Sequence, residues 1–521
     1  MKIPLTPLRC LHRAIDLYPH KEGIVCGEKR FTYALFGERC QRLASALAKA
    51  GVRSGDRVAY LSFNTHRLLE GYFGVPQARA MFMPLNVRLT PPELGVILQH
   101  SEPRMLFHEN DFTPLVEQLH KAWPGMRTIN LDTEYEDLLG IGEPERADIL
   151  SYDENSIAEL FYTSGSTGTP RGVMLSHRTV FMHALEVGGV FNQDDTGIEL
   201  HTIPMFHANG WGRPQSATML GVKHVMIRRF DPATVCRLIQ DEKVTAMLLV
   251  PTMAGALLAF PDLTKHDLSS LRNIFIGGAA SSPELIQCME SAFHCEVLAG
   301  YGLTETCPVA AIARKKGTVA YVDENDRYRR QAMAGWPLPG AEMRVTDNSL
   351  QDVPRDMTSI GEVVIRGDNV MDGYYRDPEA TAAAMAGGWL HTGDMAVWDT
   401  EGYVQIVDRK KDIIISGGEN ISSIEVEHAL AAHPSVAEAA VVGAPDSIWG
   451  EVPVAFIVTR PGLSCTDKDL LDFAAQRVAK FKLPRRFEFQ AEPLPKGGTG
   501  KVLKRELREK FWQGKERRVQ G

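Results

Sequence analysis

Long apolar runs are absent from this 521-residue sequence. None approaches the roughly 18 consecutive apolar residues that a membrane-spanning helix needs. The first seven residues hold one lysine and two prolines and lack the apolar core of a signal peptide. The eight cysteines are dispersed without a Cys-x-x-Cys pair, which argues against both a zinc site and a disulfide framework. We therefore expect a soluble cytoplasmic protein with at most peripheral membrane contact.

Positive charge is also scarce relative to negative charge. The chain carries 57 Lys and Arg against 65 Asp and Glu, a net charge of −8. This balance argues against a protein that binds nucleic acid through bulk attraction to phosphates. A hydrophobic content of 44% and a charged content of 23% are typical of globular proteins. The length predicts more than one domain, and no nucleic-acid partner is expected.

Strand-like apolar runs alternate with helix-length segments through the first four hundred residues. Examples of such runs are 57–62, 80–85, 246–250 and 273–278, and the Ala/Leu-rich segment 40–50 has helical spacing and stops at Gly51. This alternation predicts a large N-terminal domain of layered α/β subdomains. From about 335 to 407, short β-rich runs separated by Pro, Gly and Asp predict a β-barrel-like subregion.

The charged hexamer 407–412 lies between apolar runs and predicts a domain junction. Beyond it, Ser422–Glu425 fits a capping box that opens a helix with Val426, Ala429 and Leu430 on one face. Strands are expected at 436–442 and 454–458, and a helix at 467–480. We predict a large domain over 1–408, a small mobile α+β domain over 412–521 and a hinge at 409–411. The basic tail 504–518 is expected to be a solvated helix face.

A loop rich in hydroxyl groups and glycine follows the strand-like run 157–162. It reads Thr163-Ser-Gly-Ser-Thr-Gly168 and precedes a second strand-like run at 173–176. Backbone N–H groups and hydroxyls in such a loop are suited to holding phosphate oxygens. It is not a Walker loop, because no Gly-Lys-Ser/Thr follows at the required spacing. Taken alone, a Ser/Gly-rich run of this kind is more often a flexible polar turn than a phosphate-binding loop.

Five further motifs follow in order: 203–211 with His207, 300–305 with Glu305, 391–394 with Asp394, 408–420, and 495–501 with Lys501. Each has a simple explanation when taken singly, such as a core histidine, a turn former or a surface lysine. Together, over essentially the whole chain, they resemble the acyl-adenylate-forming superfamily. This superfamily includes AMP-dependent acyl-CoA synthetases, coumarate-CoA ligases, firefly luciferase and peptide-synthetase adenylation domains. The local sequence looks most like bacterial medium- to long-chain fatty-acyl-CoA synthetases.

The resemblance implies a reaction in two halves. A fatty-acid carboxylate attacks the α-phosphorus of ATP, bound with Mg²⁺, and gives an acyl-adenylate and pyrophosphate; coenzyme A, the co-substrate, then displaces AMP. In this family the small domain swings about a hinge, which falls at Lys411. The swing removes Lys501 and brings in the segment that begins at Ser416. Lys501 is expected to bridge the carboxylate and the α-phosphate, and Asp394 to bind the ribose hydroxyls.

The resemblance also assigns residues to each ligand. The expected catalytic residues are Lys501, Glu305 and His207, and the expected Mg²⁺ ligands are Thr163 and Glu305. The expected ATP- and AMP-binding residues are Thr163, Ser164, Gly165, Ser166, Thr167, Gly168, Arg171, Gly278, Ala279, Gly300, Tyr301, Gly302, Thr304, Asp394, Arg409 and Lys411. The expected acyl-binding residues are His207, Trp211, Ala299 and Gly302. The expected coenzyme A-binding residues are Ser416, Gly417, Gly418 and Trp449.

Some positions depart from the family pattern, and several alternatives stay open. Arg171 replaces a lysine, Ile415 stands where relatives often carry lysine, Asn420 replaces an aromatic residue, and Ala299 stands where glutamine is frequent. The alternatives are an aryl-acid or short-chain thioether-acid CoA ligase, a stand-alone adenylation protein that loads a carrier, and a luciferase-type oxygenase. Relatives form dimers, so a homodimer is expected from the resemblance alone.

Overall fold

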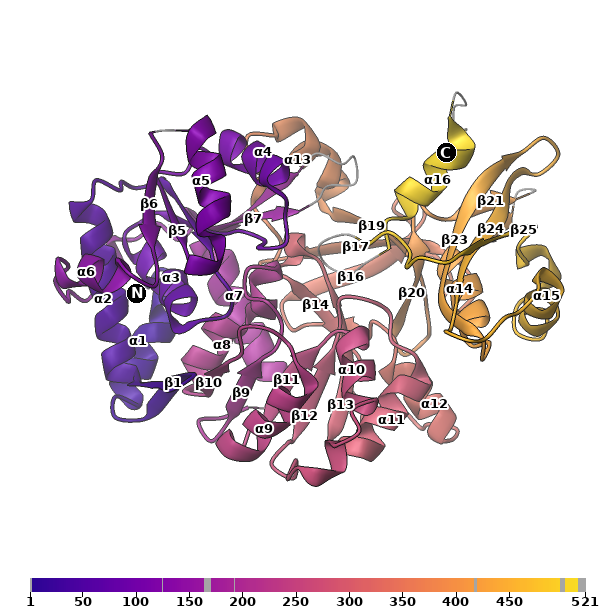
Figure 1. Cartoon of the computed structure of the whole chain (residues 1–521), viewed down its shortest axis with the longest axis horizontal. Coiled ribbons are helices and arrows are strands. Elements are labelled where there is room, and N and C mark those ends of the chain that lie inside the picture. The colour runs from indigo at the N-terminus through magenta and orange to yellow at the C-terminus, as the bar shows by residue number, and fades with distance from the viewer. Residues whose placement is uncertain are drawn as a thin grey trace. The chain divides into compact units, whose positions relative to one another are not determined.

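The computed structural model describes residues 2–123, 125–163, 170–191, 193–416, 419–496 and 502–513. The chain divides into two compact units. Unit 1 comprises residues 1–343, 364–391 and 401–403, and unit 2 comprises residues 344–363, 392–400 and 404–521. Both contain helices and sheets (Figure 1). This confirms the predicted class, an α/β protein with a large N-terminal part and a small C-terminal part.

A nine-stranded sheet forms one half of unit 1. Its central strands are parallel, and antiparallel strands close both ends. In Figure 1 the helices α9 (Pro232–Glu242) and α11 (Pro283–Phe293) lie beside it. In sheet order the strands are β15 (Trp336–Pro337), β14 (Val309–Ile312), β13 (Glu296–Gly302), β12 (Asn273–Ile276), β11 (Ala246–Leu249), β9 (Ile198–His201), β10 (Lys223–Met226), β1 (Glu22–Cys26) and β2 (Lys29–Thr32).

A seven-stranded sheet forms the other half of unit 1. Its strands β3 to β7 pair in parallel, while β8 pairs antiparallel with both β7 and β18. In sheet order the strands are β18 (Gly373–Tyr374), β8 (Arg171–Ser176), β7 (Ile157–Thr163), β4 (Met81–Pro84), β3 (Arg57–Leu61), β5 (Met105–His108) and β6 (Arg127–Asn130). The strands expected at 57–62, 80–85, 246–250 and 273–278 are thus present in the two sheets.

The helix expected at 40–50 begins earlier than predicted, as part of α2 (Tyr33–Lys49). The Thr32 side chain accepts a hydrogen bond from the Leu35 backbone, so the helix starts where its cap is. Gly51, with φ of +86°, ends it as expected.

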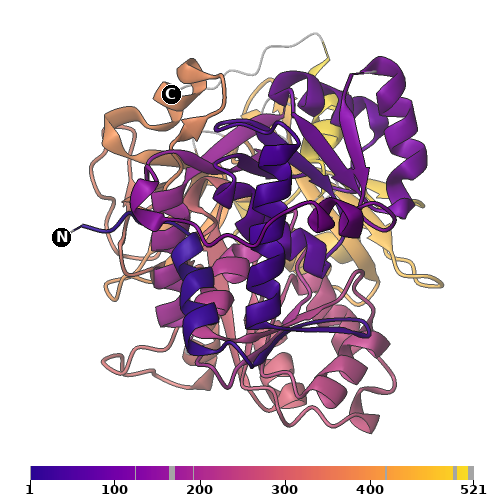
Figure 2. The same cartoon turned by 90° about the vertical axis from the view of Figure 1, so that its left-hand side faces the viewer.

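Figure 2 shows α1 (Leu8–Leu17) and α2, in indigo, on the side of unit 1 that faces the viewer. The other helices of unit 1 are α3 (His66–Gln77), α4 (Pro91–Ser101), α5 (Thr113–Ala122), α6 (Tyr135–Gly140), α7 (His177–Val190), α8 (Arg213–Leu220), α10 (Pro251–Leu258), α12 (Glu324–Gln331) and α13 (Pro378–Ala384).

Short strands occupy the region expected to be β-rich. They form a four-stranded sheet in the order β16 (Ala341–Thr346), β17 (Gly361–Gly367), β19 (Leu390–Trp398) and β20 (Val404–Arg409). In unit 2 a five-stranded sheet follows, in the order β22 (Glu419–Ile421), β21 (Ile414–Ser416), β24 (Gly450–Thr459) and β23 (Val436–Asp446), with β25 (Arg486–Gln490) paired to β24.

The helices of unit 2 confirm one prediction and correct two. Ser422 caps α14 (Ser423–Ala431), which buries Val426, Ala429 and Leu430 as expected. The helix expected at 467–480 ends as α15 (Asp467–Ala474), because the chain turns there and Val478 packs into the core. The basic tail was expected to be solvated. In α16 (Lys504–Trp512), however, the side chains of Lys504 and Arg508 are only 14% and 16% exposed, since both meet carboxylates.

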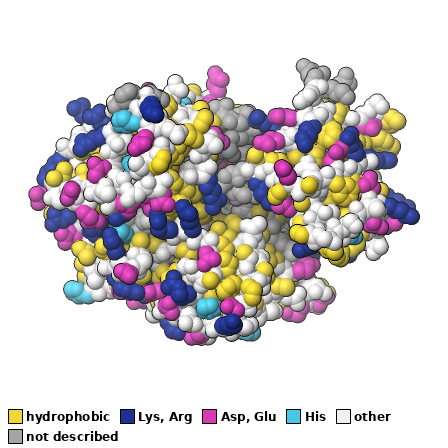
Figure 3. Space-filling view, in the orientation of Figure 1, with side chains coloured by type: hydrophobic (Ala, Val, Ile, Leu, Met, Phe, Trp, Pro, Cys, Tyr) yellow, Lys and Arg dark blue, Asp and Glu magenta, His cyan; other side chains and the backbone are white. Residues whose placement is uncertain are grey.

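Charged side chains of both signs are interspersed over the face shown in Figure 3. Among the described residues, no helix combines the length and the apolar character needed to cross a membrane. The eight cysteines form no disulfide with one another in this structure.

Candidate active site

The carboxyl ends of the parallel strands in unit 1 bring several predicted site residues to one edge of the sheet. His207 lies in the segment after β9, Gly278 and Ala279 follow β12, and Tyr301 lies near the end of β13. Because β9, β11, β12 and β13 run parallel, the segments that follow them emerge at the same edge. Ligands of open α/β sheets bind outside the carboxyl ends of such strands. This edge is therefore the candidate site of unit 1.

Trp211 is held at this edge by a left-handed turn. From Ala208 to Gly212 every φ is positive, between +46° and +75°. Each non-glycine residue in this region costs about 1–2 kcal/mol. The turn places the indole against the loop after β12, since a Cβ on Gly277 would lie 3.0 Å from Cη2 of Trp211. The predicted acyl-binding tryptophan therefore lies directly beside the predicted nucleotide-binding Gly278.

The buried ring of His183 on α7 packs against Gly212 of this turn. A Cβ on Gly212 would lie 2.3 Å from Cε1 of His183, so only glycine fits there. Burial lowers the pKa of His183 to about 3, so the ring is neutral. Its Nε2 accepts a hydrogen bond of 3.1 Å from the Val309 backbone, which places the ring proton on Nδ1. No motif in the sequence pointed to His183.

Glu186, one helical turn further along α7, is a buried acid without a hydrogen-bond partner on either oxygen. A Cβ on Gly340 would lie 2.2 Å from its Oε1, so the carboxyl packs against backbone. Burial raises the pKa of Glu186 to about 8. The side chain is therefore largely protonated at neutral pH and must lose its proton at an unfavourable site as the pH rises.

We expect Glu186→Gln to change how stability depends on pH. A raised pKa contributes stability below the unfolded-state value, about 4.3, and that contribution is lost as the pH rises through about 8. Each pKa unit corresponds to about 1.4 kcal/mol. Relative to pH 5, the unfolding free energy of the variant should therefore gain about 4 kcal/mol on that of the wild type by pH 9. Thermal unfolding at pH 5, 7 and 9 measures this. A difference that stays constant across the three pH values would show that Glu186 does not titrate in this way.

Arg171, which pairs with Thr163 at the end of β7, and Glu305 both contact Tyr374. Thr163 pairs with Arg171 across the β7–β8 ladder, and the guanidinium carbon of Arg171 lies 5.2 Å from the ring centroid of Tyr374. The Tyr374 hydroxyl donates a 2.9 Å hydrogen bond to Oε1 of Glu305. Burial, aided by Glu305, raises the pKa of Tyr374, which keeps this donor protonated. Sequence reasoning missed Tyr374, because β18 pairs with β8 from two hundred residues away.

Two glycines of β13 differ in what surrounds them. A Cβ on Gly302 would lie 1.8 Å from the Pro308 carbonyl oxygen, so this position must be glycine for the fold. A Cβ on Gly300 would meet nothing of the protein closer than 3.5 Å. Ala299, by contrast, is 4% exposed and lies in the sheet, and Thr304 is also buried. Gly300, unlike Gly302, could therefore carry a methyl group at ordinary van der Waals distance from its neighbours.

Asp394 and Arg409 form a pair in unit 2. They are register partners on β19 and β20, and Nε of Arg409 lies 2.6 Å from Oδ1 of Asp394. Asp394 is nearly buried, while the Arg409 side chain is 41% exposed. Lys411 follows in the turn after β20 and is exposed. The predicted ribose-binding carboxylate is thus already oriented by a cation.

Two predicted coenzyme A-binding residues also meet in unit 2. Ser416 on β21 pairs with Gly450, the residue after Trp449. The Trp449 backbone N–H donates to Asp446 with a 2.9 Å hydrogen bond, and its indole is 47% exposed with Arg485 at 5.9 Å from the ring. An exposed tryptophan beside an arginine is suited to a flat anionic ligand such as a nucleotide. Arg485 was not singled out in the sequence.

The remaining predicted residues lie outside the described part of the chain. They are Ser164, Gly165, Ser166, Thr167, Gly168, Gly417, Gly418 and Lys501.

Comparison with known proteins identifies the family. The AMP-binding enzyme family matches residues 11–375, and the AMP-binding enzyme C-terminal domain matches residues 425–501. The chain belongs to the AMP-binding enzyme family. It is 39% identical to a long-chain-fatty-acid–CoA ligase of Thermus thermophilus, over 96% of this chain and 94% of the relative. It is 35% identical to a peroxisomal butyrate–CoA ligase of Arabidopsis thaliana, over 97% and 93% of the two chains.

A solved structure agrees with this assignment. An anthranilate CoA ligase in complex with anthranoyl-AMP is 26% identical and matches with a TM-score of 0.87, over 98% of both chains. The chain is an AMP-forming acid–thiol ligase that makes acyl-CoA through an acyl-adenylate, with coenzyme A as co-substrate. Its substrates are accordingly small molecules: a carboxylic acid, ATP and coenzyme A.

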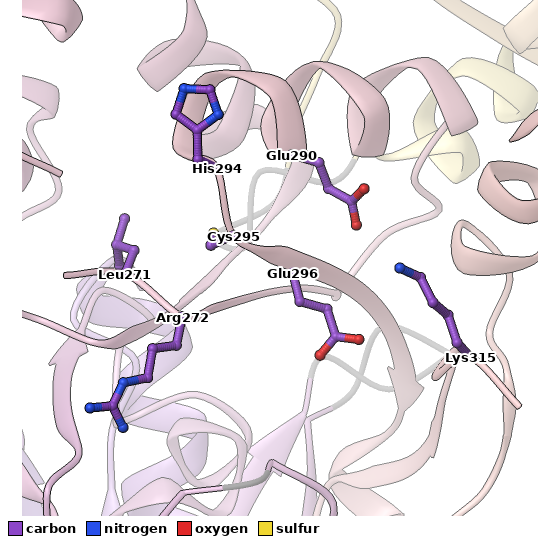
Figure 4. A pocket seen from close by; sticks show the side chains of 7 residues that line it. All are labelled: Leu271, Arg272, Glu290, His294, Cys295, Glu296 and Lys315. Carbon is purple, nitrogen blue, oxygen red and sulfur yellow. The ribbon is translucent and has the colours of Figure 1, made fainter. Parts of the chain in front are cut away.

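A cavity of about 450 Å³ lies elsewhere on this AMP-binding enzyme, at the amino end of β13 (Figure 4). It is lined by Leu271, Arg272, Glu290, His294, Cys295, Glu296 and Lys315. The Glu290 carboxylate is already engaged by Arg327 and Gln331. Burial raises the pKa of Cys295 to about 12, so its thiol is not a nucleophile at neutral pH. This cavity lies at the opposite end of β13 from Tyr301 and has no part in the chemistry above.

Proposed function

We propose that the acid is a medium- to long-chain fatty acid. The observation that carries this choice is the 39% identity to a long-chain-fatty-acid–CoA ligase over nearly the whole length of both chains. The surroundings of Trp211 support it, because the indole packs against an apolar cluster that includes Val187, Phe191, Leu248 and Leu298. An apolar wall suits an alkyl chain and offers no hydrogen bonds to a polar acid.

In the first half-reaction, a carboxylate oxygen attacks the α-phosphorus and pyrophosphate leaves. Two anions must meet, so the protein supplies positive charge and donors. Lys501 bridges the carboxylate and the α-phosphate, while the hydroxyl-rich loop and Arg171 bind the β- and γ-phosphates. Tyr301 stacks on the adenine beside Gly278, Ala279 and Gly300. Asp394 binds the ribose hydroxyls with help from Arg409, and His207 lies beside the carboxylate.

Glu305 and Thr163 would hold Mg²⁺ with the bound ATP. Their chemistry fits, because Mg²⁺ prefers oxygen ligands, takes few from protein and completes its shell with phosphate and water. When bound, the ion neutralises charge on the phosphate oxygens. The Tyr374 hydroxyl orients the Glu305 carboxylate by donating a hydrogen bond to Oε1.

In the second half-reaction, the coenzyme A sulfur attacks the acyl carbonyl carbon and AMP leaves. We assign Ser416, Gly417 and Gly418 to the pantetheine arm and Trp449 to the nucleotide end. Support comes from the pairing of Ser416 with Gly450, because Gly450 is the residue next to Trp449 in the chain. The large domain would span 1–408 and the small domain 412–521, with a swing at Lys411 between the two half-reactions. A cytoplasmic location and a homodimer complete the proposal.

The alternatives are separated by one assay. Pyrophosphate and AMP release is followed with acids from acetate through palmitate to benzoates, with and without coenzyme A. Steady turnover with fatty acids that requires coenzyme A is the expected result. Faster turnover of benzoates would indicate an aryl-acid ligase. A single burst that coenzyme A cannot convert to turnover would indicate a carrier-protein acceptor, and light emission or oxygen uptake would indicate an oxygenase.

Gly300→Ala tests the proposed adenine site without disturbing the fold. A methyl group there meets no protein atom closer than 3.5 Å, so the melting temperature should stay within about 2 °C of the wild type. If adenine lies against this backbone, the KM for ATP should rise about tenfold or more. Gly302→Ala is the contrasting variant, because its methyl group clashes with Pro308 and should lower stability itself. An unchanged KM for ATP in Gly300→Ala would remove Gly300 from the adenine site.

A further inference from the structure

The turn after β20 is held within unit 2 by an unusual set of buried charges. Lys410 and Lys411 are its central residues, and the Asp412 N–H donates to the Arg409 carbonyl with a 2.8 Å bond that closes it. The Lys410 N–H donates to the Gly393 carbonyl at 2.8 Å, so the chain up to this residue is anchored on β19. The turn is thus the last segment tied to the four-stranded sheet.

Asp408 connects this anchored strand to α14 across the turn. Its Oδ2 accepts hydrogen bonds from both the backbone N–H and the hydroxyl of Ser423, at 2.5 and 2.6 Å. The same hydroxyl oxygen accepts from the Lys504 ammonium at 2.6 Å, which also lies 2.7 Å from Glu427. Asp408 and Ser423 are 1% and 0% exposed. The chain before the turn and the chain after it are therefore joined through a buried network.

Helix α16 holds the turn from its other side. One guanidinium nitrogen of Arg508 donates to the Lys411 carbonyl at 2.7 Å and to the Asp412 carboxylate at 2.9 Å. Both Lys504 and Arg508 belong to α16, which begins three residues after Lys501 in the sequence. The same helix therefore forms hydrogen bonds both with the Lys411 carbonyl of the turn and with the Ser423 hydroxyl of the network.

This network is poorly explained by stability alone. One ammonium faces two carboxyls, and burial raises the pKa of Glu427 to about 7 and also raises that of Asp408. Buried charges cost desolvation free energy, and apolar residues of similar size are often as stable or more so. Charged hydrogen bonds do have one property that apolar packing lacks: they specify one arrangement of the backbone and are lost together when it changes.

We propose that Asp408, Ser423 and Lys504 form a latch that holds the turn at Lys410–Lys411 in one of the two arrangements used by the enzyme. Release of the latch is then a step between adenylate formation and thioester formation. Lys504 is a positioning residue, since it acts through Ser423 on Asp408. The inference rests on the proposed swing at Lys411, which it deepens by naming what holds the swing back.

The test compares Lys504→Met with Lys510→Met, the same substitution at an exposed position of the same helix. Cleavage by trypsin after Lys410 and Lys411 is followed by mass spectrometry without substrates. Acid-dependent ATP–pyrophosphate exchange and thioester formation from supplied acyl-adenylate are measured separately. In Lys504→Met, cleavage should speed up about tenfold and the ratio of the two half-reaction rates should shift about tenfold, because one charge-assisted bond is lost. Lys510→Met should change neither.

Ser423→Ala removes the shared hydroxyl and replaces Lys504→Met in the test if that variant does not fold. In Ser423→Ala, the cleavage rate and the ratio of the two half-reaction rates should each change about threefold. Cleavage at the control rate would overturn the latch, and so would faster cleavage with an unchanged ratio. An equal loss in both half-reactions would overturn it as well. Failure of the proposed function is distinguishable, because a wild type inactive in both half-reactions would refute that function while the cleavage comparison still tests the latch.

Discussion

Lys501→Ala should reduce adenylate formation by about 10²–10³-fold or more and leave the second half-reaction largely intact. Negative charge builds up between the attacking carboxylate and the α-phosphate, and a positioned cation is the largest stabilising contribution available there. The reaction needs no protein nucleophile, and no other cation is assigned to both the carboxylate and the α-phosphate. Acid-dependent ATP–pyrophosphate exchange measures the first half, and thioester formation from supplied acyl-adenylate measures the second.

Lys496→Ala is the matched control, because Lys496 lies in the same segment and pairs with Glu438 on the surface. It should leave both half-reactions within about twofold of the wild type. If Lys501→Ala instead lost both half-reactions equally, the lysine would not be specific to adenylate formation. The separate use of one site for two reactions would then be wrong.

Glu305→Gln should lower kcat/KM for MgATP by about 10²-fold or more. The substitution keeps the size of the side chain and its ability to accept from Tyr374, but it removes the negative charge that a divalent cation requires. Adenylate formation should become more dependent on the Mg²⁺ concentration, and part of the loss should be recovered at high Mg²⁺. Titration of exchange activity with Mg²⁺ at fixed ATP measures this.

Tyr374→Phe separates the charge of Glu305 from its orientation. This variant keeps the carboxylate and loses one hydrogen bond of 2.9 Å. Its kcat/KM for MgATP should therefore fall about three- to tenfold. Equal losses in Glu305→Gln and Tyr374→Phe would mean that Glu305 acts only by positioning. A Glu305→Gln enzyme with an unchanged Mg²⁺ dependence would exclude the residue as a metal ligand.

The sequence was most informative where local chemistry decides the structure. The strands that precede the site loops and the Ser422 cap of α14 follow from apolar runs and capping residues a few positions apart. These features need no knowledge of distant parts of the chain.

What the sequence could not predict depends on contacts between distant segments. The left-handed turn of Trp211 exists because Gly212 must clear the His183 ring, and no local pattern marks this contact. Tyr374 meets Glu305 only because β18 joins the edge of the seven-stranded sheet. The sequence predicted that Lys504 would be exposed to solvent. Its partners, Ser423 and Glu427, lie on another helix of unit 2, so no local pattern marks them.

The most direct test of the account is ATP–pyrophosphate exchange with a fatty acid in the absence of coenzyme A, followed by addition of coenzyme A. An acyl-adenylate intermediate requires exchange that depends on the acid, and then formation of one acyl-CoA and one AMP for each ATP consumed. Exchange without any acid, or release of ADP and phosphate in place of AMP and pyrophosphate, would contradict an acyl-adenylate intermediate and with it the assigned chemistry.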